Sequence, residues 1–293
     1  MPTAKEIWAK VKKIQFKTDR LINSVLSGQY ASVFRGVGIE FEEVRLYQPG
    51  DDIRSIDWNV TARTGSPYIK RYVEERELSV MLLVDLSASQ YFGSVNALKS
   101  DLAAEISALL SFLAIKNNDQ VGLLLFSDCC EKYLPPQKGR RHVLRVIREI
   151  LGYRPSEKKT DLAAALGYLN TILKRRSIVF ILSDFFDTDF EKALQGLKRR
   201  HDVIAIRIED PREESLPEIG LIRLQDVETG YNAMIDTSEE KARAEIQARV
   251  FVRRKKLERL FRKNKIDYVT VSTGYSYLEP LQKLFLKRER RIG

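Results

Sequence analysis

The sequence contains few cysteines and no long apolar run. Its only two cysteines, Cys129 and Cys130, are adjacent, and neighbouring cysteines rarely meet the geometry of a disulfide bond. The most apolar run, residues 102–115, is interrupted by Glu105 and is shorter than the ~18 uncharged residues of a membrane span. The amino-terminal residues have neither the apolar stretch nor the cleavage site of a signal peptide. We therefore expect free thiols and a soluble, cytoplasmic protein.

Acidic residues are outnumbered by basic ones. The 293 residues include 50 Lys and Arg against 40 Asp and Glu, a formal net charge of +10 at pH 7. This charge permits an acidic protein surface, an anionic membrane or nucleic acid as a partner and does not choose among them. Apolar residues make up 44% of the chain, enough to bury a sizeable core.

Apolar segments and helical patterns alternate after residue 78. Strands are predicted at 78–85, 120–126, 177–184, 202–209 and 267–272, and helices at 95–117, 140–152, 161–174, 189–200, 239–264 and 276–288. Near-continuous apolar strands separated by helices are typical of a parallel sheet covered on both faces. The segment 130–134 is predicted as an antiparallel edge strand. We therefore predict an α/β fold with a mostly parallel sheet.

The residues before 78 follow other patterns. Residues 4–27 have apolar side chains at helical spacing with lysines between them, which predicts a helix that either docks on its own domain or binds a membrane surface or a partner. Residues 35–77 predict short strands and turns, with a short helix near 53–61. We predict an amino-terminal helix and β-rich extension over 1–77, followed by the sheet domain over 78–293.

The extension is dense in charge of both signs. Arginines and acidic residues alternate through it, which indicates either a paired, structural ion network or a partner-docking surface. The pairing is favoured because so many opposite charges lie in one block. Trp58 is predicted to be a packing anchor.

Two predicted strands end in an aspartate. Asp85 ends the first strand of the sheet and is followed at alternate positions by Ser87 and Ser89, and Asp184 ends a later strand. Ligands of open α/β sheets bind at the carboxyl ends of strands, where the strand order reverses. Right-handed crossovers allow these two strands to flank that point. Thr160, in a loop that enters the next helix, offers a further hydroxyl.

Carboxylates and hydroxyls are hard oxygen ligands. They suit Mg²⁺, or Mn²⁺ in its place, in a site that keeps some waters. The predicted metal ligands are Asp85, Ser87, Ser89, Thr160 and Asp184. Two further aspartates are left out of the site: Asp161 is predicted to be the N-cap of helix 161–174, and Asp187 to cap the helix that follows it.

Four short motifs resemble the von Willebrand factor A domain. DLSAS at 85–89 resembles the D-x-S-x-S signature of its metal-ion-dependent adhesion site, and VGLLLFSD at 121–128 resembles its second strand. KTDLAAAL at 159–166 resembles the segment with the metal-site threonine, and SDFFD at 183–187 the segment with the second aspartate. The resemblance implies the same five ligands.

A second resemblance covers the upstream segment. GVGIEFEEVRLYQPGDDIRSIDWNVTARTGSPYIKRYVEERELSV, residues 36–80, resembles the hallmark of the bacterial "domain of unknown function 58" family, and the match extends from about residue 35 to 190. Members of this family attach the block directly to a von Willebrand A-like domain. The resemblance implies a partner, because proteins of this type accompany an AAA+ ATPase of the MoxR class.

These observations predict a metal-dependent protein-interaction module without catalysis. The held Mg²⁺ accepts an acidic side chain from the partner, and the chain acts as an adaptor or co-chaperone of a MoxR-type ATPase. The alternative is a Mg²⁺-dependent phosphoesterase or nuclease. Against it, Ser87 stands where an aspartyl-phosphate phosphatase needs a second acid, neither His142 nor His201 has a catalytic context, and there is no P-loop.

The predicted helix 239–264 has apolar residues on one face and a run of lysines and arginines over much of the rest. This pattern fits a solvated face, and equally a surface for an acidic partner or for peripheral contact with an anionic membrane. Nucleic acid is the least favoured partner, because the basic segments lack interleaved aromatic residues and a recognisable reading motif.

Overall fold

The computed structural model describes residues 4–21, 39–74, 78–94, 97–155, 159–225 and 230–292. The chain forms two compact units, residues 34–78 and residues 1–33 with 79–293. The structure therefore groups residues differently from the predicted segments 1–77 and 78–293, because helix α1 (Ala4–Leu21) packs against α4 and α5 of the larger unit. Residues 22–27 of the predicted first helix lie outside the described residues.

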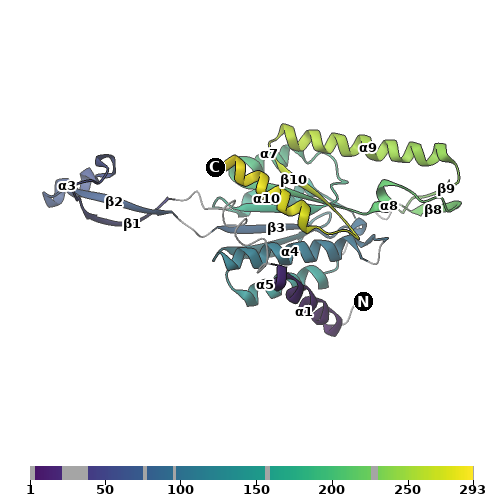
Figure 1. The fold of residues 1–293 in the computed structure, drawn as a ribbon, viewed down its shortest axis with the longest axis horizontal. Coiled ribbons are helices and arrows are strands. Elements are labelled where there is room, and N and C mark those ends of the chain that lie inside the picture. The colour runs from purple at the N-terminus through teal and green to yellow at the C-terminus, as the bar shows by residue number, and fades with distance from the viewer. Residues whose placement is uncertain are drawn as a thin grey trace. The chain divides into compact units, whose positions relative to one another are not determined.

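The larger unit is built on a six-stranded sheet with the strand order β10-β7-β6-β3-β4-β5 (Figure 1). Its strands are β3 (Ser79–Asp85), β4 (Gln120–Phe126), β5 (Cys130–Gln137), β6 (Ile178–Ser183), β7 (Asp202–Glu209) and β10 (Asp267–Ser272). All neighbours are parallel except β4 and β5, which are antiparallel. The predicted mostly parallel sheet and its antiparallel edge strand are confirmed.

Helices cover both faces of this sheet (Figure 1). The helices are α4 (Lys99–Lys116) and α5 (Arg140–Gly152) on one face, α6 (Leu162–Ile172) and α7 (Glu191–Arg200) on the other, and α9 (Glu240–Lys263) and α10 (Leu278–Ile292) along β10. Because both faces are covered, the central strands are apolar on both sides, and residues 80–84 of β3 are fully buried. None of the described helices combines the length and apolar character needed to cross a bilayer.

Strands β3 and β6 are neighbours in the sheet, paired from Val80↔Ile178 to Val84↔Leu182. The helix after β3, α4, lies on one face of the sheet, and the helix after β6, α7, lies on the other (Figure 1). The chain therefore leaves these two strand ends in opposite directions. This divergence defines the switch point at which α/β sheets bind ligands.

The smaller unit contains one antiparallel hairpin. β1 (Ile39–Leu46) pairs with β2 (Tyr68–Glu74), and a 3₁₀ turn, η2 (Ile53–Ser55), and helix α3 (Trp58–Thr64) lie between them. Arg45 donates two hydrogen bonds to the carboxylate of Asp51, at 2.7 and 3.0 Å, as a paired network would require. The Trp58 side chain is 66% exposed, so its prediction as a packing anchor was wrong.

The larger unit contains a hairpin that the sequence analysis did not predict. The missed elements are the short helix α8 (Pro211–Glu214) and strands β8 (Leu221–Gln225) and β9 (Asn232–Asp236). The two cysteines are free thiols, as predicted, with Cys129 exposed and Cys130 half-buried.

Candidate metal centre

Asp85 ends β3 at the carboxyl edge of the sheet and is fully buried. Both carboxylate oxygens accept hydrogen bonds: Oδ1 from the Ser87 backbone N–H at 2.8 Å, and Oδ2 from the Ser183 hydroxyl at 2.6 Å. Ser183 is the last residue of β6, so the second bond joins the ends of the two neighbouring strands. A carboxylate offers about four lone-pair positions, so both oxygens keep capacity for a cation.

The two serines of the DLSAS motif meet side by side. The short 3₁₀ turn η3 (Ala88–Tyr91) begins after Ser87, and the Ser87 and Ser89 hydroxyl oxygens lie 3.0 Å apart. Ser87 is buried and Ser89 is partly exposed. The alternate spacing thus places both hydroxyls beside the carboxylate that ends β3, where they can share one ligand.

Thr160 lies in the loop that enters α6. The next residue, Asp161, donates its backbone N–H to the carbonyl of Ser127 at 2.8 Å, and Ser127 directly follows β4, the strand beside β3. Asp161 also accepts a hydrogen bond from the Ala164 N–H at 2.7 Å, which confirms it as the N-cap. The threonine loop therefore reaches the same edge of the sheet as Asp85.

Asp187 has a different role from the predicted one. Its carboxylate accepts a hydrogen bond from the backbone N–H of Leu162, at the start of α6, at 2.7 Å. It does not cap α7, which begins at Glu191, so that prediction was wrong. The backbone N–H groups at the start of a helix need partners, and Asp187 supplies one across the sheet edge.

Asp184 directly follows β6 and is buried. Its Oδ2 accepts a hydrogen bond from the ammonium of Lys99 at 2.8 Å, and Lys99 donates a second one to Glu213 at 2.6 Å. Lys99 is the first residue of α4 and is completely buried. Burial lowers the pKa of this lysine, but the carboxylates of Asp184 and Glu213 outweigh burial and hold it above its ordinary value. Lys99 is therefore a permanent cation beside the candidate centre.

The two aspartates of the site affect each other electrostatically. Burial and the nearby carboxylate of Asp184 raise the pKa of Asp85 to about 7, although hydrogen bonds from Ser183 and Ser87 lower it. A cation close to both carboxylates would reverse this rise, because it favours the ionised form. A carboxyl group binds a metal in its deprotonated form, so metal binding and ionisation of Asp85 favour each other.

Aromatic and basic side chains surround Asp184. Two cations lie over the Phe186 ring, Arg253 of α9 at 3.4 Å and Lys99 at 5.4 Å from its centroid. The neighbouring Arg254 is paired with Glu214 of α8. Part of the basic run on helix 239–264 is therefore engaged within the protein and is not a solvated face.

Gln90, one residue after Ser89, is also buried. Neither its amide oxygen nor its amide nitrogen has a hydrogen-bond partner among the described residues. Buried polar groups are nearly always hydrogen-bonded, to protein or to ordered water. The Gln90 amide can therefore still donate and accept hydrogen bonds in the turn that follows the DLSAS motif.

The structure brings Asp85, Ser87 and Ser89 into one hydrogen-bonded group, links Asp184 to it through its neighbour Ser183, and brings the Thr160 loop to the same edge. Sequence reasoning missed Ser183 and Lys99. The only indication of a role for Ser183 in the sequence was its position immediately before Asp184. Lys99 had none, because a lysine in a helix is usually solvated.

The two histidines of the chain lie at the other ends of the strands. His142 Nε2 lies 2.8 Å from the carbonyl oxygen of Val121, near the start of β4. His201 Nδ1 accepts a hydrogen bond from the backbone N–H of Ser177, just before β6, at 3.3 Å. Neither imidazole is at the carboxyl edge where Asp85 lies.

Fold and site together define a mixed α/β protein whose sheet gathers oxygen donors at its switch point. The chain belongs to the family described as "Protein of unknown function DUF58", which matches residues 43–256. An uncharacterized protein of Mycobacterium tuberculosis is 36% identical over 225 residues, which are 76% of this chain and 71% of the relative. The uncharacterized protein YeaD of Bacillus subtilis is 29% identical over 108 residues, 36% of this chain and 25% of that protein.

Two solved structures are similar to this chain at low sequence identity. The conserved hypothetical protein BatB from Bacteroides thetaiotaomicron has a TM-score of 0.49 at 15% identity, over 73% of this chain and 99% of that one. The VWA domain of SpRpn10 has a TM-score of 0.41 at 13% identity, over 72% of this chain and 95% of that one. The fold itself is established by the strand order and by the helices on both faces of the sheet.

Proposed function

We propose that this chain is a non-catalytic protein-interaction module that binds its partner through a metal ion at the carboxyl edge of the sheet. The observation that carries the proposal is the hydrogen-bonded group of Asp85, Ser87 and Ser89 beside a second buried carboxylate, Asp184. Thr160, on the adjacent loop, completes the proposed ligand set. When bound, the ion supplies an open coordination position for an acidic side chain.

The donor set fits Mg²⁺ or Mn²⁺ in kind, because all five side chains offer hard oxygen atoms. Asp85 keeps lone pairs on both oxygens. Asp184 Oδ2 accepts a hydrogen bond from Lys99, while Oδ1 accepts, among the described residues, a single long hydrogen bond of 3.3 Å from the Phe186 N–H. We therefore propose that Asp85 and the two serines contact the metal ion directly. Asp184 contacts it through Oδ1 or through a bridging water.

The proposed partner offers an aspartate or glutamate. Lys99 and Arg253 lie around Asp184, and positive charge there favours the approach of an acidic group. The family resemblance of the upstream block suggests which protein this is, an AAA+ ATPase of the MoxR class. We propose that the chain serves as an adaptor or co-chaperone of such an ATPase.

A hydrolase is the competing function, and two observations weigh against it. Both histidines lie at the opposite ends of the strands, so neither can act as a general acid or base at Asp85. Ser87, which stands two residues after Asp85, has no carboxylate to offer. Phosphatase or nuclease turnover that disappears in Asp184→Ala would replace the interaction module with a Mg²⁺-dependent enzyme.

The direct experiment is co-precipitation of a MoxR-type ATPase from the same organism by this chain, in Mg²⁺ and in EDTA. We expect capture in Mg²⁺ and loss of capture in EDTA or with Asp85→Ala. Glu240→Ala is the control, since Glu240 is an exposed acid at the start of α9 and belongs to neither group of possible metal ligands. Capture that Asp85→Ala leaves unchanged would defeat the metal-bridged mechanism.

A further inference from the structure

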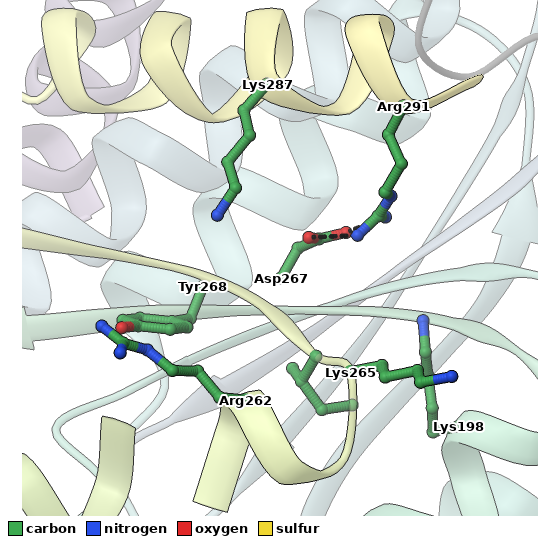
Figure 2. A pocket seen from close by; sticks show the side chains of 8 residues that line it. Lys198, Arg262, Lys265, Asp267, Tyr268, Lys287 and Arg291 are labelled. Atoms are coloured by element: carbon green, nitrogen blue, oxygen red, sulfur yellow. Dashed lines mark hydrogen bonds and ion pairs between the residues drawn. The ribbon is translucent and has the colours of Figure 1, made fainter. Parts of the chain in front are cut away.

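A hollow of about 610 Å³ lies at the amino-terminal edge of the sheet, where β10 begins (Figure 2). Three regions far apart in the sequence form it: the end of α7, the turn from α9 into β10, and α10. The lining residues are Lys198, Arg262, Lys265, Ile266, Asp267, Tyr268, Lys287 and Arg291. Because the neighbouring strands run parallel, this pocket is at the opposite edge of the sheet from Asp85.

The lining of this basic pocket contains five cationic side chains and one carboxylate. The carboxylate, Asp267, is already neutralised, because Arg291 donates hydrogen bonds of 2.7 and 3.0 Å to it and the buried Arg288 pairs with it as well. Lys265 and Lys287 have no acidic partner among the described residues, and both are exposed. Lys198 pairs with Asp202 at 3.3 Å and Arg262 lies 3.9 Å from Glu258, so Lys265 and Lys287 are the cations that give the pocket its positive field.

Lys265 has an unusual backbone conformation. Its φ is +52°, and the bond from the Ile266 N–H to the carbonyl of Phe261, at 2.9 Å, closes the turn that ends α9. This position of a helix-terminating turn favours glycine, because a Cβ is disfavoured in the left-handed region. The chain carries a lysine there instead, and that lysine lines the pocket.

Arg262 and Tyr268 form the third part of the lining. The Tyr268 ring packs against Phe261, with centroids 5.3 Å apart, and Figure 2 shows the Arg262 guanidinium beside this ring. A hydrogen bond between the Arg262 and Tyr268 side chains raises the pKa of Arg262. The guanidinium is thus held over the pocket by a packed aromatic ring, which reduces the entropy that it loses when it binds an anion.

We propose that this basic pocket binds a compact, multiply charged phosphate group. Its volume lies in the range of small-ligand sites, and lysine and arginine from several directions are the usual partners of phosphate. An acidic peptide spreads its charge along a chain, and single-stranded nucleic acid needs a long track with stacking aromatics. The same chemistry is offered by a soluble polyphosphorylated compound and by a phospholipid head group. The proposal is independent of the metal site.

The test uses inorganic pyrophosphate as a probe, titrated calorimetrically into the full chain. We expect saturable binding that weakens about tenfold or more in the double variant Lys265→Glu/Lys287→Glu, since two attractive charges become repulsive. The matched control is Lys192→Glu/Lys241→Glu, which reverses two exposed lysines outside the lining and should leave the affinity unchanged. Thermal unfolding of all three proteins checks that each is folded.

Co-sedimentation with vesicles separates the two sources of phosphate. Vesicles of equal parts phosphatidylcholine and phosphatidic acid, whose phosphomonoester head group can carry two negative charges, are compared with phosphatidylcholine alone. Pocket-dependent binding to the anionic vesicles identifies a lipid head group, and pocket-dependent binding to pyrophosphate alone identifies a soluble ligand. The proposal is overturned if neither probe binds, or if the pocket and control variants weaken binding equally.

Discussion

The ammonium of Lys99 lies 2.8 Å from Oδ2 of Asp184, and both side chains are buried. One of the two carboxylates at the switch point therefore already has a cation supplied by the protein. Glu213 shares the same ammonium at 2.6 Å. The other carboxylate, Asp85, accepts hydrogen bonds from the Ser87 N–H and the Ser183 hydroxyl and has no ion pair among the described residues, so it is the one left to attract an ion from solution.

Replacement of Lys99 by methionine should strongly destabilise the protein. The change leaves Asp184 buried without its cation, and breaking a buried ion pair from one side costs about 3–5 kcal/mol. Urea unfolding should show this loss in the free energy of unfolding. The control is Lys10→Met, which breaks a pair of the same 2.8 Å length to Asp101, with Lys10 53% exposed. An exposed pair contributes about 1 kcal/mol at most, so equal losses in the two variants would contradict a special role for Lys99.

Metal uptake should depend on Asp85 and not on the group of possible ligands around Asp128. We expect calorimetry to detect Mg²⁺ or Mn²⁺ binding to the wild type, and Asp85→Ala to weaken it about 100-fold or more, given what loss of supporting groups alone costs. Asp128, Cys129 and Glu131 form a second group of possible ligands in the turn after β4. If Asp128→Ala abolishes uptake while Asp85→Ala does not, the ion binds in that turn.

His201 should remain neutral in the folded protein at mildly acidic pH. Burial, and the nearby Arg200 and Arg176, lower its pKa, and its Nδ1 accepts the Ser177 N–H only as a neutral imidazole. Unfolding restores a pKa of about 6.5, so the unfolded chain binds the proton and the stability contributed by this histidine decreases as the pH falls below that value. NMR titration of the imidazole signals tests this directly, with the urea-unfolded protein as reference. A folded-state pKa at or above the unfolded one would contradict the burial argument.

Loss of the cap at Asp161 should lower stability without affecting metal binding. Its carboxylate accepts the Ala164 N–H at the start of α6, and removal of such a cap by Asp161→Ala costs about 1 kcal/mol. Asp161→Asn, which keeps the acceptor oxygen, should lose much less. Thermal unfolding measures both. If Asp161→Ala also removes Mg²⁺ uptake, the loop that carries Thr160 is positioned by this cap.

Five of the six strands of the sheet could be predicted to within one residue at each end, while β5, predicted at 130–134, extends to Gln137. Strand β3 was predicted at 78–85 and observed at Ser79–Asp85, and β7 and β10 have the predicted bounds. Strands β3 and β7 are buried on both faces and therefore have nearly continuous apolar sequences. The edge strand β10 alternates buried and half-buried residues, which is also a typical strand pattern. The hairpin of β8 and β9 has no such run, because one of its faces is exposed and side chains such as Leu221 and Met234 lie on it.

Only the parts of the site formed by residues close together in the sequence could be predicted. The DLSAS spacing leads directly to a turn that brings two hydroxyls together, because the residues involved are neighbours in the chain. The pairing of Lys99 with Asp184 spans 85 residues and leaves no local pattern. The exposure of Trp58 was missed for a related reason, since an aromatic residue has the same propensity whether or not a neighbouring surface exists to cover it.

Helix α1 packs against α4 and α5 of the unit that holds the sheet, while residues 34–78 form a unit of their own. The sheet unit is therefore made of two segments, residues 1–33 and 79–293, and residues 34–78 are inserted between them. A truncation designed to begin at the block would strip that unit of a helix and uncover the buried Val11 and Ile14 contacts. An internal deletion with a short bridge would leave both parts of the sheet unit present.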